Sequence, residues 1–395
     1  MKILVLNIGS TSFRFKLYDI NRLDLIASGK MENLSTENSY CIYDNLNGKI
    51  KFDYNVSNVF DALSLTNKLI LNDATGVIDS IDEIAAIGHR VVHGGNFFKN
   101  STIITNDIEN KIEQLIPLMP LHGPRTLETI KLCKLLYKNS INVAVFDTAF
   151  HQTIPIENQL YAIPIHYYTK YGVRKYGAHG ISYSSVLKRY TEIKQINKDS
   201  INTIICHLGG GCSMCNIKNG KSFDTTMGFT PLAGLIMASR SGNIDPSIIL
   251  YLIKNCNISV EQIEKELNEE SGYYGITGET DAKKIVEESL KGNPKAIILR
   301  KMANNDFKKN LLGMMSINEP DSIILTGGMG TKNKEQRELF LSDLEHFNII
   351  IDKEKNNKVF DSEAIISTNK SIPIYVIPDD EEKEIATECV KILRR

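Results

Sequence analysis

The sequence has 395 residues, 42% apolar and 24% charged, which is ordinary for a globular protein of about two domains. Its 46 basic and 47 acidic residues leave a net charge of -1, which argues against nucleic acid or an anionic membrane as the main partner. The seven scattered cysteines argue against a disulfide framework and fit a reducing cytoplasm. The run Met1 to Leu6 is too short for a signal peptide, and no apolar run approaches the roughly 18 residues of a membrane span.

The chain opens with two strand-like runs joined by a turn of small residues. Strands are expected over 2–8 and 12–19, with Gly9 and small hydroxyl residues between them. Because glycine permits a positive φ and a close backbone approach, the N–H groups of such a turn can point at one anion. One glycine-rich hairpin alone is weak evidence for a phosphate site.

Two later strand-like runs, 85–92 and 142–147, each carry a charged residue at or near their end. Arg90 lies just before paired glycines and presents a planar fork suited to a carboxylate or phosphate, with a surface salt bridge as the alternative. His89 and His93 would form a metal pair on a helix, but the segment has the pattern of a strand, which argues against zinc. Asp147 follows a buried run, at the end of a strand where ligand crevices commonly open, although a helix cap is equally compatible.

His179 lies between small residues, where little would block a ligand. A cationic or hydrogen-bonding imidazole at this position could stabilise charge on a phosphoryl group in transfer. The alternative is a core histidine whose hydrogen bonds are satisfied within the fold.

The opening pattern returns about 200 residues later. A strand over 202–207 leads into Gly209-Gly210-Gly211 and then into an alternating run. We interpret this repeat as a duplication that gives two related domains with the active site between them, and the alternative is chance. Cys206, Cys212 and Cys215 are expected to be strand residues, because no second cysteine pair lies near Cys212-x-x-Cys215 to complete a metal or redox site.

The rest of the chain adds three polar segments. Arg240 precedes a helix N-terminus and could clamp one anionic substrate together with Arg90. A strand over 322–326 runs into a turn of Gly327, Gly328 and Gly330, which could hold phosphate or let a ribose lie close to the backbone. After a strand over 373–377, the acidic residues 379–382 either satisfy the dipole of the last helix or reach Mg²⁺.

Helix signals alternate with these strands, which indicates the α/β class. Asp245 and Asn293 each precede a proline as N-cap residues, and Ser259-x-x-Gln262 has the form of a capping box. The helix after Asn293 should bury one face that consists of Leu299, Ala303, Phe307, Leu311 and Met314, and the C-terminal helix from about Asp380 should bury Ile385, Cys389 and Ile392.

With these motifs in place, the chain resembles the acetate kinases from end to end. The resemblance is carried by the first hairpin, by the segments 143–152 and 222–232, and by the acidic start of the last helix. It implies the α/β fold of two ribonuclease-H-like domains that acetate and sugar kinases share with Hsp70 and actin. The expected domains are 1–150, completed by the helix 380–395, and a nucleotide-binding domain over 151–379.

The resemblance also implies an activity and its partners. The activity is reversible, direct in-line transfer of a phosphoryl group between ATP and acetate, with ADP and acetyl phosphate as products. It implies Mg²⁺, with Mn²⁺ as an alternative, a small carboxylic acid and a nucleotide as ligands, and a cytoplasmic homodimer.

The same matching implies roles for individual residues. Arg90, Asp147, His179 and Arg240 are expected to be catalytic, and Asn7 and Glu381 to lie on the metal side. His122, His179 and His207 are expected to contact the transferring phosphoryl group. The acyl substrate is expected to meet Arg90, Val92, Leu121, Ala178, Pro231 and Arg240. The nucleotide and its phosphates are expected to meet Ser10, Ser12, Arg14, His207, Gly209, Gly210, Gly211, Asp281, Lys283, Gly327, Gly328 and Gly330.

Several positions depart from the usual acetate kinase pattern. Ala178 replaces a Phe beside the acyl pocket, which leaves propionate and butyrate open as substrates. Tyr183 replaces a His, and Gly210 replaces an Asn. Gly123 and Arg125 replace Asn residues, Lys283 replaces an Arg near adenine, and Thr331, Lys332 and Asn333 replace Glu-Asn-Ser. The changes on the nucleotide side leave another nucleotide or pyrophosphate open as donor, and a nucleotide-sensing protein with degraded catalysis is the alternative of another class.

Overall fold

Two compact units make up the computed structural model, which describes residues 1–9, 12–72 and 74–394. The first unit joins Met1–Ala149 to the C-terminal segment Asp380–Arg395, and the second is Phe150–Asp379. Among the described residues, no helix is long and apolar enough to cross a membrane.

The first unit is built on a mixed sheet, which has eight strands in the described residues, in the order β5-β4-β3-β2-β1-β6-β8-β7. Strands β1 to β5 are antiparallel neighbours, β6 is parallel to β1, β8 is parallel to β6, and β7 is antiparallel at the edge. The strands are β1 (Lys2–Ile8), β2 (Ser12–Asp19), β3 (Leu25–Glu32), β4 (Tyr40–Asn45), β5 (Gly48–Asp53), β6 (Ile84–Val91), β7 (Thr102–Ile103) and β8 (Ile141–Phe146).

Helices cover both faces of this sheet. They are α1 (Val59–Leu71), α2 (Asn106–Gln114), α3 (Gly123–Leu136) and α15 (Glu381–Leu393), with short 3₁₀ turns at Ile81–Glu83 and Ile116–Leu118. Along β2, Phe13, Phe15 and Leu17 alternate with polar residues and are buried with residues of α1 and α3 in one apolar cluster. The polar alternate positions of β2 are therefore left for the other face.

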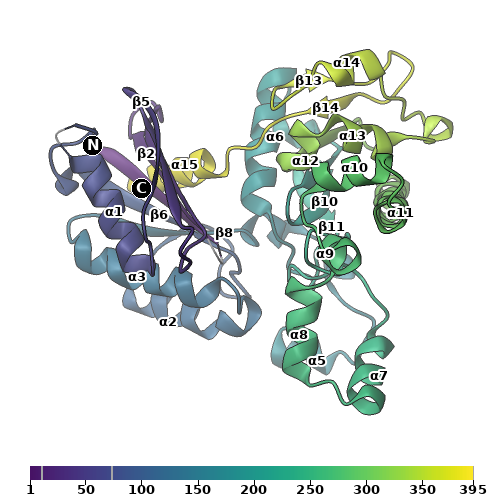
Figure 1. The fold of residues 1–395 in the computed structure, drawn as a ribbon, viewed down its shortest axis with the longest axis horizontal. Coiled ribbons are helices and arrows are strands. Elements are labelled where there is room, and N and C mark those ends of the chain that lie inside the picture. The colour runs from purple at the N-terminus through teal and green to yellow at the C-terminus, as the bar shows by residue number, and fades with distance from the viewer. Residues whose placement is uncertain (10–11, 73, 395) are drawn as a thin grey trace. The chain divides into compact units, whose positions relative to one another are not determined.

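The C-terminal helix α15 packs on β1 and β6 of the first unit. Figure 1 shows this helix in yellow against the purple strands. Gly88 on β6 makes the approach possible, because a Cβ atom there would lie 2.5 Å from Ile385 Cγ2 and 2.9 Å from Cys389 Sγ. Ile385 and Cys389 are fully buried as expected, whereas Ile392 is only half-buried.

The second unit has six strands in the described residues, in the order β11-β10-β9-β12-β14-β13. They are β9 (Thr203–Leu208), β10 (Cys212–Lys218), β11 (Lys221–Thr225), β12 (Ser322–Thr326), β13 (Ala364–Ile365) and β14 (Ile374–Val376). The helices are α4 (Ile156–Gln159), α5 (His166–Tyr171), α6 (Gly180–Lys194), α7 (Pro246–Cys256), α8 (Val260–Glu269), α9 (Gly272–Thr277), α10 (Ala282–Leu290), α11 (Pro294–Ile317), α12 (Gly327–Lys332), α13 (Lys334–Leu341) and α14 (Lys353–Asn357). Short 3₁₀ turns span Ala149–Thr153, Lys198–Ser200 and Glu345–Phe347.

Two apolar clusters hold the helices of the second unit to its sheet. On one face, Tyr183, Val186, Leu187 and Tyr190 of α6 pack with residues of β9, β10, β12 and β14. On the other, the predicted apolar face of α11 packs with alternate residues of β9 and β10. The prolines and caps at the starts of α7 and α11 are as expected, with Asp245 and Asn293 accepting backbone N–H bonds.

The two sheets share one strand order. Each has an antiparallel three-strand meander (β1-β2-β3 and β9-β10-β11), then two parallel strands beyond the first strand (β6 and β8, β12 and β14), then a short antiparallel edge strand. A repeated order of this kind is what a duplication predicts.

The structure also differs from the sequence-based expectation. The polar or short strands β3, β4, β5, β7, β11 and β13 were not predicted. Ser259 caps α8 by accepting the N–H of Gln262, but the Gln262 side chain donates to Glu266 instead of closing a capping box. The Gln262 amide is turned toward Glu266, one turn along the helix, and no bond from the Ser259 backbone N–H to its oxygen forms.

Candidate active site

The first unit gathers a polar network at the ends of β1, β6 and β8. Asp147 Oδ2 accepts from Arg90 Nε at 3.1 Å and from Nη2 at 2.8 Å. Arg90 Nη1 donates to Asn7 Oδ1 at 3.3 Å. Asp147 is almost fully buried, whereas the Arg90 side chain keeps 22% of its exposure. The guanidinium is therefore fixed along one edge and accessible elsewhere, an arrangement suited to binding an anion.

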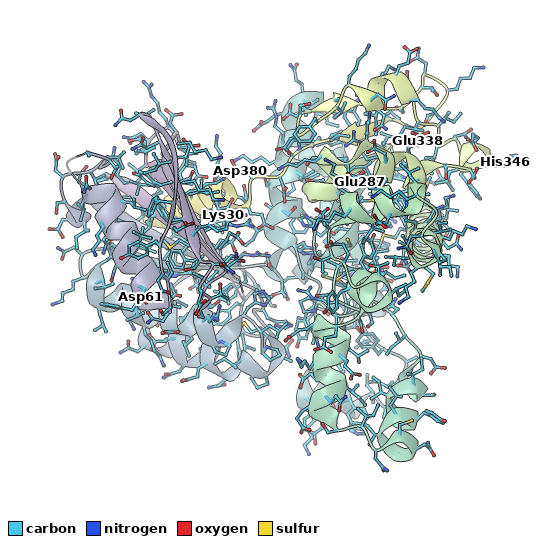
Figure 2. All side chains as sticks on the ribbon, in the orientation of Figure 1. Lys30, Asp61, Glu287, Glu338, His346 and Asp380 are labelled. Atoms are coloured by element: carbon cyan, nitrogen blue, oxygen red, sulfur yellow. The ribbon has the colours of Figure 1, made fainter. Side chains whose placement is uncertain are left out.

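The start of α15 completes this network. Asn7 Nδ2 donates to Glu382 Oε1 at 3.1 Å, and Glu381 Oε2 lies 3.6 Å from Arg90 Nη1. Lys16, on β2, is 3.2 Å from Glu382 and 3.1 Å from Asp380, which is labelled in Figure 2. Because the amide nitrogen of Asn7 is committed to Glu382, its oxygen is directed toward Arg90.

Charge pairing sets the ionisation of this network. Burial alone lowers the pKa of Lys16 and of Arg90, but neighbouring carboxylates outweigh burial and raise both pKa values. Burial raises the pKa of Glu382, but the charge of Lys16 and the hydrogen bond from Asn7 outweigh it and lower the pKa. All three groups are therefore ionised around neutral pH.

The side-chain oxygen atoms at the ends of β1, β6 and β8 and at the start of α15 suit a hard divalent cation as ligands. They are the oxygens of Asn7 and Glu381, and close to them Asp147 Oδ1 is buried with no hydrogen-bond partner among the described residues. Mg²⁺ prefers such oxygens and usually takes only one or two carboxylates besides water and phosphate. In the described part of the chain, no three His, Cys, Asp or Glu side chains form a complete metal cage, so water and phosphate oxygens would have to supply the other ligands.

The other predicted residues of the first unit lie around this network or in the opening turn. Ser10 lies outside the described residues. Gly9 N donates to Ser12 O at 2.8 Å, and Arg14 is exposed on the same sheet face as Asn7, 3.9 Å from Glu32. Val92 follows β6 and packs against the apolar cluster under α2 and α3, and Leu121 and His122 immediately precede α3.

The second unit gathers its predicted residues around the turn between β9 and β10. A Cβ atom on Gly209 would lie 3.2 Å from His207 Nε2, and one on Gly211 would lie 3.2 Å from His179 Nε2 and 3.5 Å from Arg240 Nη1. The two imidazole rings are stacked, with centroids 4.1 Å apart. Two histidines and an arginine therefore line one glycine-rich turn, which is a suitable cradle for phosphate.

Each imidazole is held by a serine. His179 Nδ1 is 2.8 Å from Ser213 Oγ, and His207 Nδ1 is 2.8 Å from Ser182 Oγ and 3.5 Å from Asp379. His179 has a φ of +58°, a left-handed backbone that is uncommon outside glycine. Strained backbone of this kind is often found at functional sites, because the surrounding fold must enforce it.

The Arg240 segment is tied directly to the same turn. Ala238 N donates to Gly210 O at 3.0 Å, and Arg240 Nη1 donates to Pro231 O at 3.3 Å. Gly272, with a φ of +60°, lies beneath the segment, where a Cβ atom would come within 2.6 Å of Arg240 O. The position of Arg240 relative to the turn is therefore fixed by backbone contacts.

Ala178 is buried next to His179, in an apolar cluster with Met227 and Leu235. His151 Nε2 is 2.9 Å from the carbonyl of Ala178, and its Nδ1 is 2.8 Å from Ser222 Oγ. Burial lowers the pKa of His151 to about 4, so this histidine is neutral and fixes the 178–179 segment by hydrogen bonds.

The second glycine-rich turn of this unit, Gly327 to Gly330, packs against β9. A Cβ atom on Gly327 would come within 2.8 Å of the Leu208 backbone, whereas nothing lies within 4 Å of one on Gly328. The fully buried Arg337 holds the turn by donating to Gly330 O at 3.1 Å. Asp281 and Lys283 lie at the start of α10, where Asp281 Oδ1 accepts the N–H of Lys283.

Sequence reasoning gave no individual role to Lys16, Glu382, Ser182 or Ser213, which contact the predicted residues. Lys16 stands at a polar alternate position of a strand whose other alternate positions, Phe15 and Leu17 among them, are apolar. That position could have indicated a role for the lysine on the second face of the sheet. The serines carry no signal in the sequence, because their role depends on which histidine packs over them.

Known proteins are similar to this chain over nearly its whole length. The profile of the acetokinase family matches residues 2–387. The acetate kinase of Thermoanaerobacterium thermosaccharolyticum is 43% identical over 400 residues, covering 100% of this chain and 99% of that protein. The crystal structure of Porphyromonas gingivalis acetate kinase matches with a TM-score of 0.90 at 35% identity, over 99% of both chains. That of a propionate kinase from Francisella tularensis subsp. tularensis matches with a TM-score of 0.91 at 38% identity, over 98% of both chains. The predicted α/β fold of two related units is confirmed by these matches.

Proposed function

Since the chain belongs to the acetokinase family, we propose that it catalyses reversible transfer of a phosphoryl group between ATP and acetate, with ADP and acetyl phosphate as products. The observation that carries the proposal is the gathering of Arg240, His179 and His207 around the turn Gly209 to Gly211. Such a site offers positive charge and N–H donors to a phosphoryl group, which is what this reaction requires.

The reaction needs no general base. An acetate carboxylate oxygen attacks the γ-phosphorus, the bond from that phosphorus to the β–γ bridging oxygen breaks, and ADP leaves with the electron pair. A carboxylate is already a nucleophile, so catalysis consists of positioning and charge neutralisation in line with the leaving oxygen.

Within this mechanism, Arg90 and Arg240 are the proposed ligands of the acid. Asp147 orients Arg90 through the two hydrogen bonds to its Oδ2. His122, His179 and His207 contact the transferring phosphoryl group, and Val92, Leu121, Ala178 and Pro231 surround the acyl chain. The turns 209–211 and 327–330, with Ser10, Ser12, Arg14, Asp281 and Lys283, bind the nucleotide and its phosphates.

Asn7 and Glu381 are the proposed protein ligands of Mg²⁺ or Mn²⁺. The unpartnered Asp147 Oδ1 and the fixed orientation of the Asn7 oxygen support this assignment. The ion would neutralise charge on the β- and γ-phosphates. Glu382 keeps the Asn7 oxygen directed toward Arg90, and Lys16 keeps Glu382 ionised.

One assay tests the proposal. Acyl phosphate is trapped with hydroxylamine in reactions of acetate, propionate and butyrate, each with ATP, GTP and pyrophosphate. We expect acetate with ATP to give the highest rate. Tight ATP binding without acyl phosphate from any acid would instead favour a nucleotide-sensing protein.

Propionate is the second candidate substrate, because Ala178 is small beside the expected acyl pocket and a propionate kinase has a closely similar structure. Butyrate is a candidate for the same reason, since a small residue at position 178 leaves room for a longer acid. The lysine at position 283 and the segment 331–333 keep pyrophosphate and GTP in the assay as donors.

The enzyme is also proposed to be a cytoplasmic homodimer. Helix α7 supports the dimer, because among the described residues it has no buried side chain although Ile248, Leu250 and Tyr251 are apolar and 47%, 55% and 60% exposed. Figure 1 shows α7 at the edge of the second unit. We propose that a second copy of the chain covers this face.

Light scattering tests the dimer. Leu250→Asp should shift the dimer toward monomer, whereas Leu46→Asp, at the 88% exposed Leu46 in the β4–β5 turn, should not. A wild-type protein that is monomeric at assay concentration would refute the dimer.

A further inference from the structure

A chain of three buried polar groups ends on His179. The Tyr183 hydroxyl on α6 hydrogen-bonds Ser213 Oγ on β10, and Ser213 Oγ lies 2.8 Å from His179 Nδ1. Tyr183 and Ser213 are fully buried, and His179 keeps only 9% of its exposure. Because buried donors need an acceptor, the protons in this chain can be assigned by counting.

Within the described ranges, Ser213 Oγ is the one polar partner of the Tyr183 hydroxyl, so Tyr183 must donate its proton there. Ser213 then has its own proton to place, and its remaining partner in the same ranges is His179 Nδ1. Nδ1 must therefore accept, and any arrangement with a proton on Nδ1 leaves one buried hydroxyl proton without an acceptor.

We propose that Ser213 is a positioning residue that holds His179 as a neutral imidazole with its proton on Nε2. This inference rests on the proposed function of the same site, and it adds the protonation state of the histidine. Of the two forms that the sequence left open for His179, a cationic imidazole and a hydrogen-bonding imidazole, the proposed one is the neutral, hydrogen-bonding form.

The direction of the Nε2–H bond suits the reaction. His179 Nε2 faces Gly211, where a Cβ atom would be 3.2 Å away, so the donor points at the turn that is proposed to bind phosphate. The nitrogen thus offers one N–H to a phosphoryl oxygen without any need for the ring to be charged.

The surroundings also disfavour a cationic ring. Arg240 Nη1 would be 3.5 Å from the same Cβ position on Gly211. The His207 ring is stacked on the His179 ring, and the Nδ1 atom of His207 lies 3.5 Å from Asp379. A second positive charge beside the Arg240 guanidinium would be repelled. Tyr183, whose pKa is raised well above its ordinary value by burial, stays protonated and keeps donating.

The test reads the tautomer directly. The full-length protein is labelled with ¹³C,¹⁵N-histidine, and the His179 signals are assigned by their loss in His179→Asn. The ¹³Cδ2 and ring ¹⁵N shifts distinguish Nε2–H, Nδ1–H and the imidazolium. We expect the Nε2–H form at neutral pH in the wild type; an Nδ1–H or imidazolium signature overturns the proposal.

Two variants separate positioning from mere packing. Ser213→Ala removes the group that donates to Nδ1, so His179 should lose the Nε2–H signature, and kcat should fall about tenfold with little change in KM. Tyr183→Phe removes a buried hydroxyl of the same network but leaves the Ser213–His179 bond, so the Nε2–H signature should remain. Equal effects of both variants on His179, or none in Ser213→Ala, would refute the role of Ser213.

Failure of this inference is distinguishable from failure of the proposed function. Acyl phosphate formation by the wild type tests the function, whereas the histidine shifts are measured without substrate. An active enzyme with an imidazolium at His179 would overturn only the inference.

Discussion

His89 should make the first unit sensitive to mild acid. It is fully buried on β6, its Nε2 is 2.8 Å from Asn142 Oδ1, and its Nδ1 has no partner among the described residues. Protonation of Nδ1 would bury a charge with no acceptor beside it. Burial accordingly lowers the pKa of His89 from 6.5 to about 4, against the opposing effect of the Asn142 hydrogen bond.

The sign and size of the effect follow from these two pKa values. Between them the unfolded chain binds more protons than the folded one, so stability is complete above pH 6.5 and falls as the pH drops toward 4. Going from pH 7 to pH 5, the difference costs about 2 kcal/mol of unfolding free energy for this one histidine. That is a large fraction of the roughly 5–15 kcal/mol of a typical domain.

The matched variant is His89→Gln, which keeps an N–H donor for Asn142 but cannot titrate. Urea unfolding followed by circular dichroism is measured for wild type and variant at pH 7 and pH 5. We expect the loss of unfolding free energy from pH 7 to pH 5 to be about 2 kcal/mol smaller in the variant. The comparison between the two proteins cancels the contribution of surface carboxylates.

His151 provides the same test in the second unit, because burial lowers its pKa to about 4 as well. From pH 7 to pH 5, His151→Gln should likewise lose less unfolding free energy than the wild type. If both variants lose as much stability as the wild type between pH 7 and pH 5, the histidines are not held neutral by burial and the reasoning is wrong.

Four further substitutions test other contacts. Gly88→Ala places a methyl group 2.5 Å from Ile385 Cγ2 and should cost about 1–3 kcal/mol in urea unfolding; an unchanged midpoint would show that α15 is not seated as described. Arg240→Ala should lower turnover about 10²–10⁴-fold in the hydroxylamine assay, and a loss below about threefold would remove it from the site. Ala178→Phe, checked for folding by thermal melting, should narrow acyl preference toward acetate; unchanged ratios of propionate and butyrate to acetate would contradict the pocket assignment. Gly210→Asn should leave stability unchanged, because nothing lies within 4 Å of the added Cβ, while the KM for nucleotide changes; a loss of stability would contradict this packing.

Much of the fold could be predicted because its central strands are locally encoded. The runs 2–8, 12–19 and 322–326 coincide with β1, β2 and β12, since β-branched and apolar residues there are bounded by glycine or polar turns. The edge strand β7 is only two residues long, Thr-Ile, carries no such pattern and is held by pairing with β8. Its existence depends on its neighbour, which a local window does not contain.

Some residues of the candidate site could likewise be predicted from the sequence, and others could not. Gly211 and Gly327 could be identified from the sequence, because close backbone approach leaves a requirement for glycine that a motif displays. The pairing of Lys16 with Glu382 could not, because it exists only after the last helix has packed on a strand near the beginning of the chain. Contacts of this kind depend on the docked tertiary structure.

The packing of α15 on β6 affects the order in which the protein can mature. The second unit is one continuous segment, whereas the first unit is completed only by a helix that follows the second unit in the chain. One face of the first sheet therefore stays uncovered until α15 has been synthesised and has packed on it, and the same helix brings Glu381 and Glu382 to Asn7 and Arg90. A nascent chain stalled before that helix would therefore carry an exposed apolar sheet and an incomplete set of carboxylates.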